Sequence, residues 1–293
     1  MESNKNVLKF RDIILIFLPI FCAILIQYGT NLCDMIIIFV GHITDKSPVN
    51  KNLSLTEILN NTVKQPMNQA YLTLATYSLY ILVFGIWYKR AFCPDPVRSY
   101  LKLPDKAAVK KAITIAVCLL IAGALAQIFV DGAMALARPH FPDIFKEYDE
   151  HTRNVTGAGA SLVMYFTVFF VAPVGEELLF RGLIFRYSKK VMPAVCAILL
   201  NAVVFGLYHS NSIQIIYALF MGIVLCTVAN KFDSILPSIL LHMSVNCSMI
   251  LVRESWFENH TRTIIITALG FVLFVSLIIF ILIFEQKNKL TRE

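Results

Sequence analysis

Eight long apolar stretches alternate with shorter polar segments along the chain. They cover residues 13–40, 70–87, 112–136, a fourth from Ser161 to the basic residues that begin at Arg186, and then 193–208, 213–230, 235–252 and 263–284. Stretches of this length and apolarity are typical of helices that cross a bilayer. No flexible linker or internal repeat divides them. The pattern predicts an all-α fold, a polytopic membrane helix bundle of about eight transmembrane helices, with residues 1–293 forming a single membrane domain.

Composition agrees with this pattern and excludes a soluble globular protein. Apolar residues make up 57% of the chain and charged residues only 15%. The net charge of +7 could suggest a nucleic-acid partner, but the basic residues lie between the apolar stretches and form no stripe with interleaved aromatic residues. Most of the seven cysteines lie inside apolar stretches without the spacing of metal ligands. We therefore expect the lipid bilayer as a partner and no nucleic acid.

The basic residues also predict an orientation. If the N-terminus lies inside, 18 of the 26 Lys and Arg residues fall in inner segments. Inner loops of membrane proteins are enriched in these residues. We predict an integral membrane protein with both termini in the cytoplasm, located in the plasma membrane if the protein is bacterial.

Charged residues interrupt the fourth apolar stretch, where they are costly because the hydrocarbon interior disfavours charge. On a helix, Glu177 and Arg181 stand at i and i+4 and can form an ion pair. Glu176 points about 100° away and has no cationic partner in its own helix. The group is either a structural charge cluster at the membrane boundary or the site of a catalytic carboxylate, which needs partners elsewhere.

Such partners occur in later stretches. Asn201, Phe205 and His209 share one helix face, and His242 and Asn246 share another. Singly, each His is typical of a helix end and each Asn of a contact between helices. Together with a carboxylate, two imidazoles and an amide provide a general base, an orienting group and a clamp for an oxyanion.

Counting along the chain places two of these groups at one depth. Glu176 and His209 are equally far from the turn near Pro193, so in an antiparallel hairpin they lie side by side. This predicts that His209 is the neighbour of Glu176. By the same count His242 lies nearer the inner face, and a tilt or a kink at Pro173 or Gly175 would have to bring it level.

The motifs resemble those of a known family. They are Glu176-Glu177-x-x-x-Arg181, Phe205-x-x-x-His209 and His242-x-x-x-Asn246, in this order on successive spans. This is similar to the CAAX prenyl-protease and bacteriocin-processing family, also called the Abi family. The resemblance covers residues 161–250, the motif-bearing catalytic core, and not the first 160 residues. It implies an intramembrane endopeptidase that cleaves a peptide or protein substrate, including a membrane-associated or lipidated one.

The resemblance also implies roles for the motif residues. Glu176 would activate water together with His209, and His242 and Asn246 would stabilise the oxyanion. Glu177 and Arg181 would be mainly structural, and Phe205 supporting.

Other readings remain open at this stage. Two Glu and two His could hold zinc, but the chain has no HExxH motif, and we favour the mechanism without a cofactor or metal. The bacterial members of the family divide among peptide maturation, bacteriocin immunity and unassigned functions. A non-catalytic membrane protein that binds a peptide, as in immunity, is therefore the main alternative, and a channel or transporter is a more distant one.

Overall fold

The computed structural model describes residues 10–44, 65–93, 106–156, 160–209 and 211–290. Every regular element within these ranges is a helix. The predicted all-α class is therefore confirmed for the described part of the chain. The residues outside these ranges include most of the polar segments that follow the first and second apolar stretches.

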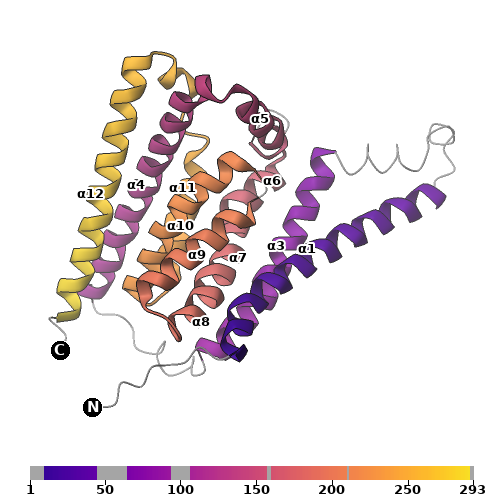
Figure 1. Ribbon diagram of the computed structural model, residues 1–293, viewed down its shortest axis with the longest axis horizontal. Coiled ribbons are helices and arrows are strands. Elements are labelled where there is room, and N and C mark those ends of the chain that lie inside the picture. The colour runs from indigo at the N-terminus through magenta and orange to yellow at the C-terminus, as the bar shows by residue number, and fades with distance from the viewer. Residues whose placement is uncertain (1–9, 45–64, 94–105, 157–159, 210, 291–293) are drawn as a thin grey trace.

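The helices form an antiparallel bundle (Figure 1). Their bounds are α1 Phe10–Thr44, α3 Pro66–Phe92, α4 Lys106–Ala137, α5 Pro142–Thr156, α6 Leu162–Phe166, α7 Ala172–Glu177, α8 Phe185–Lys189, α9 Ala194–Tyr208, α10 Ser212–Phe232, α11 Leu236–Ser248 and α12 His260–Leu290. Helices α6, α7 and α8 are parts of one continuous rod, residues 162–189. In Figure 1, α1 begins and α12 ends at the same end of the bundle, which we call the lower end. Helix α5 lies at the opposite, upper end.

Six described helices, not eight, are long and apolar enough to cross a membrane, counting residues 162–189 as one. Two predicted spans, residues 193–208 and 235–252, form helices that are too short to cross the membrane. Helix α9 has 15 residues and α11 has 13, which at 1.5 Å per residue gives about 22 and 20 Å, short of a hydrocarbon core of about 30 Å. Helix α9 ends because His209 adopts an extended backbone conformation.

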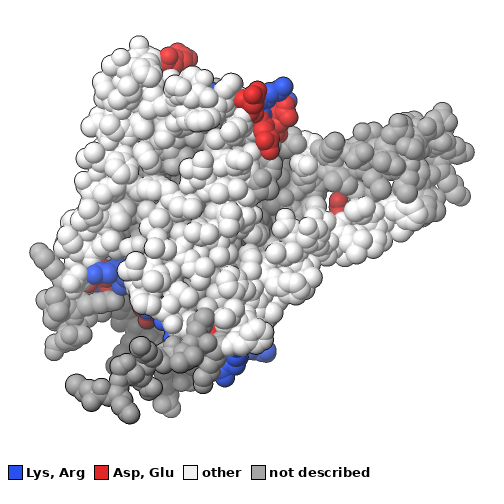
Figure 2. Space-filling model, in the orientation of Figure 1, with Lys and Arg blue, Asp and Glu red and all other residues white. Residues whose placement is uncertain are grey.

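The outside of the bundle is apolar, as expected of a surface that faces lipid. Large apolar side chains are exposed along the long helices, among them Ile37, Leu82, Ile113, Leu269 and Val272. Figure 2 shows the middle of one face almost free of charged residues, with the Lys, Arg, Asp and Glu side chains mainly toward its two ends. A soluble protein rarely exposes apolar patches of this size. The structure supports an integral membrane protein.

One element at the upper end differs from the sequence prediction, and one close helix contact was not predicted. The polar segment after the third apolar stretch lies outside every predicted helix, but it contains the helix α5, which buries Phe145 and Tyr148 against the bundle. On α4, a Cβ at Gly123 would lie 2.4 Å from the Ser244 side chain. A glycine at this position lets α11 pack directly on α4, where the Ser244 hydroxyl donates to the Leu120 carbonyl at 2.6 Å.

Candidate active site

The helix that carries the two glutamates is irregular on both sides of them. Thr167–Val171 and Leu178–Ile184 are π-helical turns, flanking α7 with Glu176 and Glu177. Such turns are frequent at functional sites because they free backbone groups and redirect side chains. In the first turn, the Ala172 amide bonds to the Thr167 carbonyl five residues earlier. In the same register Pro173 would bond to Val168, but proline has no N–H to donate.

Two asparagines bond to carbonyls of these irregular turns. The Asn246 amide donates to the Val168 carbonyl at 2.8 Å, the position left without a partner by Pro173. The Asn201 amide donates to the Phe180 carbonyl at 2.7 Å. Because an asparagine amide has two N–H groups, Asn246 keeps a second donor. The asparagines thus join α9 and α11 to the glutamate helix.

The predicted ion pair between Glu177 and Arg181 is present. The Arg181 Nη1 lies 2.7 Å from Glu177 Oε1, and both side chains are fully buried. The guanidinium carbon lies 4.3 Å from the centre of the Phe205 ring, and Nη2 donates to the Gly222 carbonyl at 3.4 Å. The Phe205 ring therefore covers a buried cation. Its edge-to-face contacts with His209 (5.0 Å) and His242 (5.9 Å) also make it the packing centre of the three motifs.

His242 joins the two glutamates. Its Nδ1 lies 3.0 Å from Glu177 Oε1, so it donates to this carboxylate, and its Nε2 lies 3.7 Å from Glu176 Oε2. The first distance is a hydrogen bond and the second is too long for one, although catalytic contacts are often long before substrate binds. Four ionisable side chains thus follow one another in contact, in the order Arg181, Glu177, His242 and Glu176, and we call this row the charged chain. Residue counting had placed His242 nearer the inner face, and the structure brings it level with the glutamates.

Glu176 has a neighbour that the sequence did not predict. The Tyr77 hydroxyl of α3 donates to Glu176 Oε1 at 2.7 Å. Gly175 permits this approach, because a Cβ there would lie 3.2 Å from Tyr77 and Tyr80. The predicted neighbour, His209, instead bonds through Nδ1 to the Phe205 carbonyl at 2.8 Å. The contacts of Glu176 come from α3 and α11.

These groups line one large cavity of about 1,070 Å³. Glu176, His209, His242 and Asn246 all contribute to its wall, as does Tyr77. The cavity extends to the upper end of the bundle, where α5 and the segment between α11 and α12 contribute to its lining. The structure thus brings the four predicted catalytic residues to one space, which is open to a substrate.

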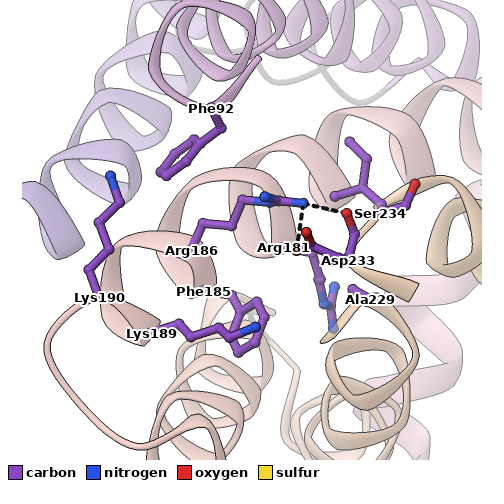
Figure 3. A pocket seen from close by; sticks show the side chains of 10 residues that line it. Phe92, Arg181, Phe185, Arg186, Lys189, Lys190, Ala229, Asp233 and Ser234 are labelled. Atoms are coloured by element: carbon purple, nitrogen blue, oxygen red, sulfur yellow. Dashed lines mark hydrogen bonds and ion pairs between the residues drawn. The ribbon is translucent and has the colours of Figure 1, made fainter. Parts of the chain in front are cut away.

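A second, smaller pocket of about 260 Å³ lies at the lower end (Figure 3). It is lined by Arg186, Lys189 and Lys190, and Arg186 donates to the Asp233 carbonyl at 2.8 Å. The buried Arg181 also lines this pocket. On its other side Arg181 bonds to Glu177, and Glu177 bonds to His242, which lines the upper cavity. The guanidinium therefore lies between the two hollows.

The two Glu and two His side chains of the motifs are not arranged as a metal centre. In the part of the chain that the structure describes, no three His, Cys, Asp or Glu side chains are arranged to hold a metal ion. Glu177 is engaged by Arg181 and His242, and His209 Nδ1 by a backbone carbonyl.

Comparison with known proteins gives one match. Residues 158–248 match the family model of the Rce1-like type II CAAX prenyl endopeptidases. No curated protein and no solved structure matches the chain. The matched range includes Glu176, His209, His242 and Asn246, and it nearly coincides with the predicted core, residues 161–250. The match supports an intramembrane protease. The resemblance predicted from the three motifs is confirmed: residues 158–248 of this chain match the Rce1-like type II CAAX prenyl endopeptidase family.

Proposed function

We propose that the protein is an intramembrane endopeptidase in which Glu176 activates water for attack on a peptide bond. The observation that carries this proposal is the position of Glu176. It is a nearly buried carboxylate without a cationic partner in its own helix, held by Tyr77 on one oxygen and facing His242 with the other, at the wall of a cavity large enough for a peptide. A purely structural carboxylate would not need access to such a cavity.

The reaction proceeds by direct attack of water. The Glu176 carboxylate takes one proton from water, and the hydroxide oxygen forms a bond to the carbonyl carbon of the substrate. The tetrahedral intermediate then collapses, its C–N bond breaks, and the proton returns to the leaving nitrogen, giving a new carboxylate and a new amine. His209 supports the proton transfer, because its Nδ1–H is held by the Phe205 carbonyl and its Nε2 is left for the reacting groups.

The oxyanion would be stabilised by donors on α11. Asn246 retains one amide N–H beyond its bond to Val168, and it lines the cavity. His242 donates through Nδ1 to Glu177, so in the imidazolium form the second proton, on Nε2, would face Glu176 and the oxyanion. Glu177 and Arg181 act as positioning residues, because they fix the ring of His242. Preorganised donors of this kind contribute most when charge develops away from water.

We also propose that the lower end of the bundle lies in the cytoplasm. The basic side chains Arg186, Lys189 and Lys190 are at this end, where α1 begins and α12 ends. The large cavity would then open on the side opposite the cytoplasm. A reporter that is active only in the cytoplasm is expected to be active when it is fused after Leu290. A reporter that is active only outside the cytoplasm should be inactive there, and activity of this second reporter would reverse the orientation.

The function is tested with purified full-length protein in lipid nanodiscs and a peptide library. Mass spectrometry detects new C-termini produced by the wild type and by Glu176→Gln. We expect products from the wild type that are absent with Glu176→Gln, and unchanged products with Glu147→Gln, a variant of an exposed glutamate on α5. If the wild type binds peptides but Glu176→Gln behaves identically in every assay, the protein is a non-catalytic binder of the immunity type.

A further inference from the structure

A second carboxylate lines the upper part of the large cavity and takes no part in the chemistry above. Asp131 of α4 accepts a hydrogen bond from the Gln127 amide, with Nε2 at 2.9 Å from Oδ1. Gln127 is neutral and 7% exposed, so it fixes the carboxylate without neutralising it. Among the ion pairs between described residues, none includes Asp131. The second oxygen, Oδ2, is left for the cavity.

The surroundings of Asp131 do not supply the missing positive charge. Arg138, the basic residue at the end of α4, is engaged by Asp149, with distances of 2.6 and 3.1 Å between nitrogen and oxygen. Tyr148 and Tyr217 lie within electrostatic reach of Asp131, and both are neutral phenols.

Arg253 and Glu258, which also line the cavity, carry opposite charges. The upper cavity therefore has an excess of negative charge at Asp131, in a place where an unpaired carboxylate is costly. A positive group on a bound ligand would offset this cost.

The two carboxylates line the same cavity, so one bound peptide can contact both. Tyr217 of α10 also lines this cavity and lies within electrostatic reach of Asp131 and of Glu176. An extended peptide that passes Tyr217 would therefore approach both carboxylates.

We propose that Asp131 is a specificity-determining residue that binds a lysine or arginine side chain of the substrate, on the upper-cavity side of the bond that is cleaved. Gln127 is the positioning residue that holds Asp131 Oδ1 so that Oδ2 faces the ligand. The inference rests on the proposed function for the cleaved bond, but the cationic subsite itself requires only that a peptide binds in this cavity. The substrate class is thus a cationic peptide segment with apolar neighbours.

Binding tests the subsite separately from catalysis. Full-length Glu176→Gln protein in nanodiscs is titrated with alanine-leucine peptides in which one lysine is moved stepwise along the sequence, and with matched peptides that carry norleucine instead. We expect the lysine peptides to bind at least about tenfold more tightly, because a hydrogen bond to a charged group is among the strong ones. Adding Asp131→Asn should abolish the difference, and Asp131→Glu should keep it. Asp143→Asn, on the exposed start of α5, should have no effect.

Charge reversal provides the second arm. Asp131→Lys should bind glutamate peptides better than lysine peptides, an exchange of preference that loss of folding cannot produce. In the wild type, the cleaved bond should move along the peptide together with the lysine. Equal binding of lysine and norleucine peptides, or a lysine preference that persists in Asp131→Asn, would overturn the subsite. Lysine-dependent binding that needs Asp131 but gives no cleavage would uphold the subsite and contradict the protease.

Discussion

Replacing Glu177 by glutamine tests how the charged chain is organised. Glu177 and Arg181 are fully buried, and their ion pair at 2.7 Å is the main compensation for the guanidinium charge. The Gly222 carbonyl at 3.4 Å and the Phe205 ring remain as weaker partners. Removing one member of a buried pair leaves the other charge uncompensated, a cost of about 3–5 kcal/mol. We therefore expect Glu177→Gln to lower stability strongly, by roughly a hundredfold or more in the folded-to-unfolded ratio.

The effect can be measured as the thermal unfolding midpoint in detergent and as the amount of protein in the membrane. Arg181→Ala should behave like Glu177→Gln. The double variant Glu177→Gln/Arg181→Met removes both charges, and it should recover much of the lost stability, because neutral replacement of a whole buried pair costs little. Asp149→Asn is the matched control. It breaks an exposed pair with Arg138, worth at most about 1 kcal/mol.

The cleavage rate is a second readout, and it separates the stability of the fold from the orientation of His242. Glu177 also accepts from His242 Nδ1, so the double variant should remain slow in cleavage even where its stability is restored. If Glu177→Gln is as stable as the wild type, the buried pair does not have the role assigned here. If the stable double variant cleaves at the wild-type rate, Glu177 does not position His242.

Three further changes have defined outcomes. Tyr77→Phe removes the donor to Glu176 and should lower kcat/KM by about tenfold or more with little change in unfolding temperature, and an unchanged rate would remove Tyr77 from the site. Gly123→Ala places a Cβ against Ser244 and should destabilise the contact of α4 with α11 by about 1–3 kcal/mol, seen as a lower unfolding midpoint; a variant as stable as the wild type would contradict it. Treatment with a chelator should leave peptide cleavage intact, whereas loss of cleavage that added zinc restores would replace the glutamate mechanism by a metal mechanism.

The sequence predicted the site well where the information is local. The pairing of Glu177 with Arg181 follows from i,i+4 spacing alone, and the structure has this pair. The apolar stretches predicted the order and alternation of the helices, because hydrophobicity over about 20 residues is a strong signal. They overestimated the spans, since stretches 193–208 and 235–252 are apolar but form helices too short to cross.

Contacts between distant segments could not be predicted in the same way. Tyr77 lies in an ordinary apolar and aromatic stretch, and nothing in its own sequence indicates that α3 approaches Glu176 at Gly175. The level position of His242 depends on the irregular helix around Pro173, where a π-helical turn changes the rotation and rise. Asp131 is a single carboxylate near the end of a span, and only the shared cavity relates it to Glu176.

The central claim is that Glu176 is the general base, and single-turnover cleavage of a peptide from the library tests it most directly. The wild type, Glu176→Gln and the surface control Glu147→Gln are compared in identical nanodiscs, with the thermal unfolding midpoint measured for each. We predict a rate for Glu176→Gln that is about 10²- to 10⁴-fold below the wild type at an unchanged unfolding midpoint, and a wild-type rate for Glu147→Gln. A rate for Glu176→Gln within a few-fold of the wild type would contradict the account.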